Sequence, residues 1–224
     1  NPPFSLEKWG FEGADSDPYA RFRRGVPPKT KGDYAFILHM IETLKPKTGR
    51  MAVVVPHGVL FRNEEQAMRA KMVEQDWVEA VIGLGPNLFY NSPMESCIVI
   101  CNRNKPKARK GKVLFIDALS EVTRERAQSF LKPAHQQRIL KAYRAFADQP
   151  GFAKVATLKE IAANGANLSI PLYVKRQTVN GKQNDKGKPA SLQAAWAQWQ
   201  AEGETFWQQM DKLTTKLDEL NENS

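Results

Sequence analysis

The pattern of apolar and polar positions predicts alternating strands and helices from residue 33 onward. Asp33 can cap a helix that Pro46 ends, and one face of that helix carries five apolar residues. Those five residues are Tyr34, Ile37, Leu38, Ile41 and Leu44. Residues 51–55 form a continuous apolar run that is typical of a strand buried on both faces, and Val78–Leu84 reads as a second strand. Asn63 can cap a helix between the two strands, with Glu64 and Glu65 in its first turn.

This strand, helix, strand order predicts an α/β fold with a parallel sheet and helices on its faces. Residues 94–101 and 113–116, joined by a basic turn at 102–112, resemble a hairpin that closes the sheet edge. Two shorter helices are predicted, at 123–131 and 134–147, and the stretch 158–174 is mixed. Residues 5–32 are rich in Gly, Pro, Asp and Arg and predict a long functional loop.

The last segment has the most regular spacing of the chain. Residues 177–190 are rich in Gly, Lys and Asn and predict a flexible linker. From Leu192 to Leu220, nine positions step by alternating four and three residues, and eight of them are apolar; only Gly203 is not. The spacing predicts a helix over 191–224 that docks on another chain, and a helix that packs on its own domain is the alternative.

The charge of the chain is strongly uneven. The sequence has 224 residues, with 33 Lys and Arg against 24 Asp and Glu, and its net charge is +9. Residues 191–224 carry −4, so residues 1–190 carry +13. The basic residues concentrate at 21–31 and 103–112, and such clusters suit a phosphate backbone or, alternatively, a solvated loop.

Several classes of protein are excluded by composition. The chain has two cysteines, Cys97 and Cys101, and four strand steps would separate them by about 13 Å, too far for a disulfide. We therefore expect a reducing, cytoplasmic location. No spacing of His and Cys resembles a metal site, and no apolar run is long enough to span a membrane.

The first four residues, Asn1-Pro2-Pro3-Phe4, form a chemically coherent group. Two prolines remove two N–H donors, which leaves the Asn1 amide oxygen and the Pro2 carbonyl to accept hydrogen bonds from an exocyclic amine. Phe4 offers a ring on which an extruded base can stack. An amine held by two acceptors has its nitrogen lone pair available for attack on an electrophilic methyl group. A proline-rich turn at a chain terminus is the alternative interpretation.

Asn1-Pro2-Pro3-Phe4 resembles the catalytic motif of amino-methylating DNA methyltransferases. Three further blocks resemble the modification subunit of type I restriction-modification systems, and with the first motif they cover residues 1–176 in the expected order. The blocks are Gly32-Asp33-Tyr34-Ala35-Phe36 with 49–61, Asn87-Leu88-Phe89-Tyr90, and Asn167-Leu168-Ser169-Ile170-Pro171-Leu172-Tyr173-Val174.

The resemblance implies a Rossmann-like class I methyltransferase sheet, of which this chain carries the later strands, with a helical C-terminal extension. It implies methylation of N6 of adenine in double-stranded DNA from S-adenosylmethionine. Asn1 and Pro2 would bind the adenine amine and Phe4 would stack on the ring. Arg21, Arg23 and Arg24 are expected to contact phosphates, and Asn87 and Tyr90 the base pocket. A specificity subunit, bound by residues 191–220, and a restriction subunit are the implied partners.

The chain departs from the family at the cofactor. The glycine-rich cofactor motif is expected upstream of Asn1, so we expect the chain to be the C-terminal portion of a longer subunit and to be inactive alone. On this interpretation residues 1–120 are half of a catalytic domain, 121–176 an extension, 177–190 a linker and 191–224 the docking helix. The alternatives are a non-enzymatic module for assembly and DNA binding, or an amino-methyltransferase acting on RNA or on protein glutamine.

Overall fold

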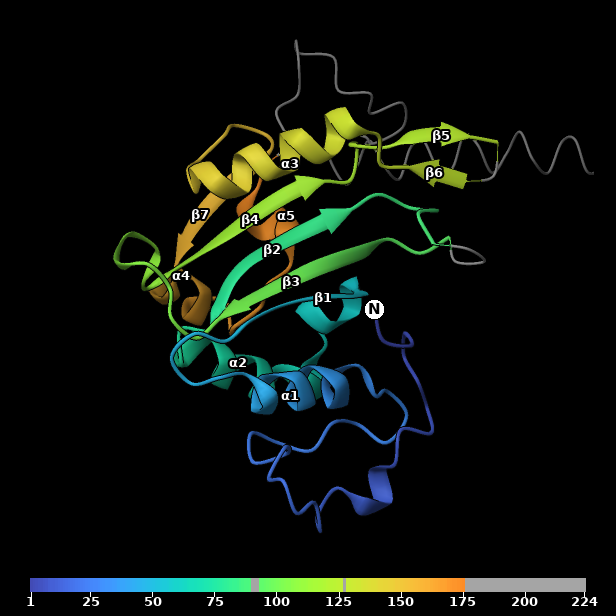
Figure 1. Ribbon diagram of the computed structural model, residues 1–224, viewed down its shortest axis with the longest axis vertical. Coiled ribbons are helices and arrows are strands. Elements are labelled where there is room, and N and C mark those ends of the chain that lie inside the picture. Colours follow the sequence, from blue (N-terminus) through green and yellow to red (C-terminus); the bar gives the residue numbers. More distant parts are fainter. Residues whose placement is uncertain (90–92, 127, 176–224) are drawn as a thin grey trace, which may run out of the picture. The chain divides into compact units, whose positions relative to one another are not determined.

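The structure is a computed structural model that describes residues 1–89, 93–126 and 128–175 (Figure 1). The chain divides into two compact units, Asn1–Gln177 and Thr178–Ser224, and only the first is described below. The predicted linker at 177–190 and the predicted docking helix at 191–224 lie outside the described residues, as does Tyr90.

A five-stranded sheet of order β1-β3-β2-β4-β7 forms the centre of the first unit (Figure 1). Its strands are β1 (Arg50–Pro56), β2 (Val78–Leu84), β3 (Ser96–Asn102), β4 (Lys112–Ala118) and β7 (Ala153–Thr157). The predicted α/β class is confirmed, but the sheet is mixed and not parallel. Only β2 and β4 pair in parallel; β3 runs antiparallel to both β1 and β2, and β7 runs antiparallel to β4.

The hairpin predicted from residues 94–101 and 113–116 is therefore wrong. β2 lies between β3 and β4, so the basic turn crosses over one strand instead of joining two neighbours. Crossing one strand spans only about 10 Å, which residues 103–111 cover easily. β1 is an edge strand of this sheet, and its face with Ala52 and Val54 is only partly covered, which corrects the expectation of burial on both faces.

Helices cover both faces of the sheet, and two apolar cores result. α1 (Asp33–Thr43) and α2 (Gln66–Glu74) pack on one face together with α4 (Leu158–Ala163) and α5 (Ile170–Tyr173) (Figure 1). α3 (Pro133–Ala145) packs on the other face, close to the predicted 134–147. Alternate strand residues supply the two cores: Val81 faces the first, whereas Ile82 faces the second. None of the described helices is long and apolar enough to cross a membrane.

The remaining elements are short. Residues 5–32 contain turns and one 3-10 turn, η1 (Phe11–Gly13), as expected of a long loop. The further 3-10 turns are η2 (His57–Leu60), η3 (Asn63–Glu65) and η4 (Lys107–Arg109). Neither predicted cap forms: Gly32 is the N-cap residue of α1, with Asp33 as the first helical residue, and Asn63 begins η3 while α2 starts at Gln66.

The helix predicted at 123–131 is instead a hairpin of β5 (Thr123–Glu125) and β6 (Gln128–Phe130). Arg126 has a left-handed backbone at its turn, with a φ of 55°. The Ser129 N–H donates to the Asn87 carbonyl oxygen at 2.8 Å. This backbone contact with a segment distant in sequence favours the extended form over a local helix.

Candidate functional site

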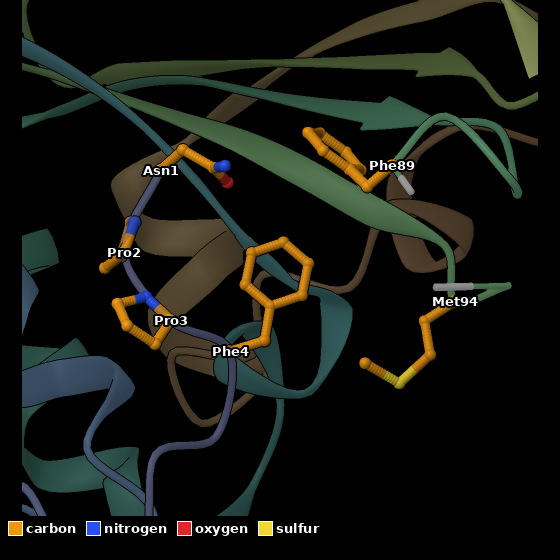
Figure 2. Close-up of a pocket in the computed structure, with 6 residues that line it drawn as sticks. All are labelled: Asn1, Pro2, Pro3, Phe4, Phe89 and Met94. Carbon is orange, nitrogen blue, oxygen red and sulfur yellow. The ribbon is translucent and has the colours of Figure 1, made fainter. Parts of the chain in front are cut away.

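Asn1, Pro2, Pro3 and Phe4 line a pocket of about 400 Å³ together with Phe89 and Met94. Figure 2 shows the Asn1 amide and the rings of Phe4 and Phe89 around this space. The two rings meet edge to face, with centroids 5.9 Å apart and an interplanar angle of 68°. The predicted tetrapeptide thus shares a pocket with a second aromatic residue from elsewhere in the chain.

Phe89 comes from the segment that follows β2 at its carboxyl end. Asn87 turns the chain there with a left-handed backbone, φ 59°, and its carbonyl is held by Ser129 of β6. Sequence reasoning selected Asn87 and Tyr90 but missed Phe89, although an aromatic residue after a strand end was visible in the same block. Asn87 is half-buried and does not line the pocket among the described residues, whereas Phe89 does.

The residues that line the pocket are mostly apolar, and Asn1 and Pro2 among them also carry oxygen atoms that can accept hydrogen bonds. Its volume lies within the roughly 300–1,000 Å³ of small-molecule sites. Phe4 and Phe89 offer ring surfaces that suit a flat heterocycle. The Asn1 amide oxygen and the Pro2 carbonyl can accept hydrogen bonds from an amine on that heterocycle. This arrangement suits a nucleobase that carries an exocyclic amino group.

The three arginines of the loop at residues 5–32 all form ion pairs, and they differ in how much of the side chain is exposed to solvent. Arg24 has an almost fully buried side chain, ion-paired with Glu42 and placed 4.6 Å from the centroid of Trp77. Arg23 also pairs with Glu42, at 3.0 Å, but exposes 55% of its side chain. Arg21 pairs with Asp17 and exposes 32%. Phosphate contact stays a prediction for all three, and Arg23 is the most accessible of them.

In the second basic cluster, residues 103–112, two side chains form ion pairs with acidic residues near the start of β2, the end of this strand opposite the pocket. Glu79, fully buried on β2, accepts hydrogen bonds from Arg109 Nη1 and the Tyr143 hydroxyl, both at 2.7 Å, and from Asn102. Lys105 is buried and pairs with Asp76 at 2.6 Å. Part of the positive charge at this turn is therefore neutralised inside the protein and is not available to nucleic acid.

The residues that the structure describes indicate neither metal nor thiol chemistry. Within the described ranges, no group of three or more His, Cys, Asp or Glu side chains could hold a metal ion. Cys97 and Cys101 are free and buried, and burial raises the pKa of both thiols, that of Cys101 to about 12. A thiol with so high a pKa is not a nucleophile at neutral pH.

Residues 1–182 match the model of the N-6 DNA methylase family. The chain belongs to this family. The four residues Asn1–Phe4, which line the pocket, lie within the matched range.

The similar proteins are methylase subunits of type I restriction enzymes. The MjaVII methylase subunit of Methanocaldococcus jannaschii is 35% identical over 184 residues, which cover 78% of this chain and 31% of the relative. The HindI methylase subunit of Haemophilus influenzae is 34% identical over 198 residues, covering 84% and 43%. The chain therefore spans between about a third and somewhat under a half of these curated relatives.

A solved structure supports the fold. The type I restriction-modification methyltransferase subunit of Streptococcus thermophilus matches with a TM-score of 0.71 and 39% identity, covering 78% of this chain and 37% of that one. The EcoKI M protein matches with a TM-score of 0.54 and 17% identity, which bears on the fold alone. The predicted class I methyltransferase-like sheet is confirmed by these neighbours.

A methylase requires a methyl donor, and the resemblance implies S-adenosylmethionine, whose glycine-rich motif would follow a strand. Gly83 in β2 and Gly85 directly after it are two glycines at a strand end. A Cβ on Gly83 would lie 2.8 Å from Ile170 Cδ1, and a Cβ on Gly85 would lie 2.5 Å from the Leu119 carbonyl oxygen. Both glycines therefore pack against protein and leave no cradle open to a ligand, so no cofactor-binding residue is assigned.

We expect the 224-residue chain alone to bind S-adenosylmethionine negligibly and to transfer no methyl group to DNA. Neither Gly83 nor Gly85 offers a cradle for the donor, and a site misplaced by about 1 Å can lose about 100-fold in rate. Isothermal titration calorimetry of S-adenosylmethionine into the 224-residue chain measures the binding. A complete methylase subunit containing residues 1–224 is the positive control. Tight binding by the 224-residue chain would contradict this expectation.

Proposed function

We propose that residues 1–175 form the target-base part of a methylase subunit that methylates N6 of adenine in DNA within a type I restriction-modification system. The observation that carries the proposal is the pocket that Asn1, Pro2 and Phe4 share with Phe89. The family match over residues 1–182 supports it, as do relatives named as type I methylase subunits.

In this proposal the chain's residues hold and activate the amine. The Asn1 amide oxygen and the Pro2 carbonyl oxygen accept the two N6 hydrogens, which favours a tetrahedral nitrogen with a free lone pair. Phe4 and Phe89 contact the extruded adenine ring and replace part of the stacking lost from the duplex. The amine loses its proton only after it has been methylated, so no general base is needed in the first step.

The proposal also names a donor, partners and a location. S-adenosylmethionine is the proposed methyl donor, held by residues other than those described. A specificity subunit, a restriction subunit and double-stranded DNA are the proposed partners, with residues 191–220 as the proposed docking helix for the specificity subunit. The net charge of +13 on residues 1–190 supports the DNA partner. A cytoplasmic location is part of the same proposal.

Replacing Phe89 with alanine is expected to weaken capture of the target base. Stacking of a base on an aromatic side chain contributes about 1–3 kcal/mol by alanine substitution. In a complete methylase that contains this chain, DNA carrying 2-aminopurine at the target adenine reports extrusion by its fluorescence. We expect the Phe89→Ala enzyme to give a smaller fluorescence change at saturating DNA and a higher KM.

Phe61→Ala serves as the matched control. Phe61 exposes 47% of its surface and does not line the pocket. Its replacement also removes a solvent-accessible aromatic ring but leaves the residues that line the pocket in place. Equal fluorescence and equal KM in the Phe89→Ala and Phe61→Ala enzymes would refute the assignment of Phe89 to the base pocket.

A further inference from the structure

The residue after the tetrapeptide is anchored to the start of α1. The Ser5 N–H donates to Asp33 Oδ1 at 2.8 Å, and the Ser5 hydroxyl lies 3.4 Å from Asp33 Oδ2. Ser5 has a left-handed backbone, φ 50°, which a residue with a Cβ adopts only when its surroundings hold it there. The Gly32 N–H also donates to the Leu6 carbonyl oxygen at 2.9 Å. The backbone directly after Phe4 is thus fixed at two points.

Asp33 is itself held by a partly buried cation, the guanidinium of Arg62. Its side chain is buried, and Arg62 Nη2 donates to Asp33 Oδ2 at 2.9 Å. Arg62 Nη1 also reaches Glu65 Oε1 at 3.3 Å, and Glu65 is fully buried. Burial raises the pKa of Glu65 to about 7. The negative charge of Asp33 also raises this pKa, whereas the positive charges of Arg62 and Arg69 lower it. Arg62 therefore contacts two buried carboxyl groups, and its contact with Asp33 is the shorter of the two.

The position of the Arg62 guanidinium depends on a glycine in the turn after β1. A Cβ on Gly58 would come within 3 Å of the Arg62 Nη2 and Cζ atoms. The guanidinium has little freedom to move away, because Asp33 and Glu65 both bind it. Gly58, Arg62, Asp33 and Ser5 therefore form one continuous chain of contacts that ends beside Phe4.

We propose that Asp33 is a positioning residue, which holds the Asn1–Phe4 segment in its reactive geometry through the Ser5 N–H. This inference rests on the proposed function, since it concerns the same tetrapeptide. Asp33 does not line the pocket, so it acts on the base only through Ser5 and Phe4. A carboxylate suits the task because it can accept from a backbone N–H and from a guanidinium at once.

The position of the segment is measured without any activity, by amide hydrogen exchange of Ser5 in the 224-residue chain. Asp33→Ala removes the acceptor, so we expect Ser5 to exchange about 10- to 100-fold faster. Asp33→Asn keeps one acceptor oxygen and is expected to restore part of the protection. Asp76→Ala is the matched control, because Asp76 also binds one cation and one backbone N–H, those of Lys105 and Gly111. Unchanged Ser5 exchange in the Asp33→Ala chain would overturn the proposal.

The effect on chemistry is measured in a complete methylase containing this chain. We expect Asp33→Ala to lower kcat about 10- to 100-fold, with KM for DNA within about twofold and with partial recovery in Asp33→Asn. If Asp33→Ala does not fold, Gly58→Ala tests the same contacts by displacing Arg62, and the same fall in kcat is expected. A normal kcat despite faster Ser5 exchange would overturn the positioning role. An inactive wild-type enzyme with the expected exchange would refute the proposed function but leave the anchoring of Ser5 by Asp33 supported.

Discussion

Replacing Asn1 with alanine in a complete methylase is expected to reduce methyl transfer about 100-fold or more while leaving DNA binding nearly unchanged. The Asn1 amide oxygen is proposed to hold the amine as its nitrogen becomes tetrahedral, and loss of one such transition-state hydrogen bond costs about 10²–10³ in rate. Binding of DNA depends mainly on phosphate contacts elsewhere, so affinity is retained. Single-turnover transfer of a labelled methyl group and a binding titration measure the two quantities separately.

Asn164→Ala is the matched control. Asn164 lies at the end of α4, is exposed, and its side chain donates to the Glu160 carbonyl oxygen. The control enzyme should retain its rate. A parallel loss of DNA affinity and rate in Asn1→Ala would show that Asn1 acts in binding and not in the chemical step.

Replacing Glu79 with alanine is expected to destabilise the 224-residue chain by about 3 kcal/mol or more. Glu79 is fully buried and accepts hydrogen bonds from Arg109, Asn102 and Tyr143, which the substitution would leave without their acceptor. Removing one partner of a buried ion pair costs about 3–5 kcal/mol of folding stability. Because 18% of the Arg109 side chain is exposed to water, we expect a value near the lower end of this range. Urea unfolding measures the change, with the exposed Glu74→Ala as control.

The same site predicts a pH dependence. Burial raises the pKa of Glu79, but the hydrogen bonds from Tyr143, Asn102 and Arg109 together outweigh it, so the pKa lies below its ordinary value. The ionised form is therefore favoured in the folded protein, and its stabilisation is present above the pKa of an unfolded glutamate, about 4.3. It is lost as the pH falls through the lower pKa of folded Glu79. A difference in stability between wild type and Glu79→Ala that does not shrink at low pH would contradict this account.

The sequence predicted the strands of the sheet better than their order. Runs such as Val78–Leu84 are marked by continuous apolar residues, and β2 has these bounds. The insertion of β3 between β1 and β2 depends on pairing between distant segments, which no local pattern carries. β7 was missed because Lys154 interrupts its short run, and the 123–131 segment was assigned to a helix because its contact with Asn87 is not visible locally.

The candidate site was only partly predictable for the same reason. Asn1–Phe4 was identified because its chemistry lies within four consecutive residues. Phe89 contacts Phe4 from 85 residues farther along the chain, and Asp33 contacts Ser5 from 28 residues farther along, so their proposed roles depend on the folded geometry. Arg24 was chosen for its charge, whereas its burial against Glu42 and Trp77 is a tertiary property.

The central claim, that this chain holds an extruded adenine for methylation at N6, is tested most directly by identifying the methylated product. A complete methylase containing residues 1–224, assembled with the proposed specificity subunit, is supplied with labelled S-adenosylmethionine and with DNA, RNA and a glutamine-containing peptide. Mass spectrometry of the digested substrates then locates the methyl group. We predict N6-methyladenine in DNA and no label in the other substrates. Label in N4-methylcytosine, in RNA or in glutamine, with none in adenine, would contradict the account.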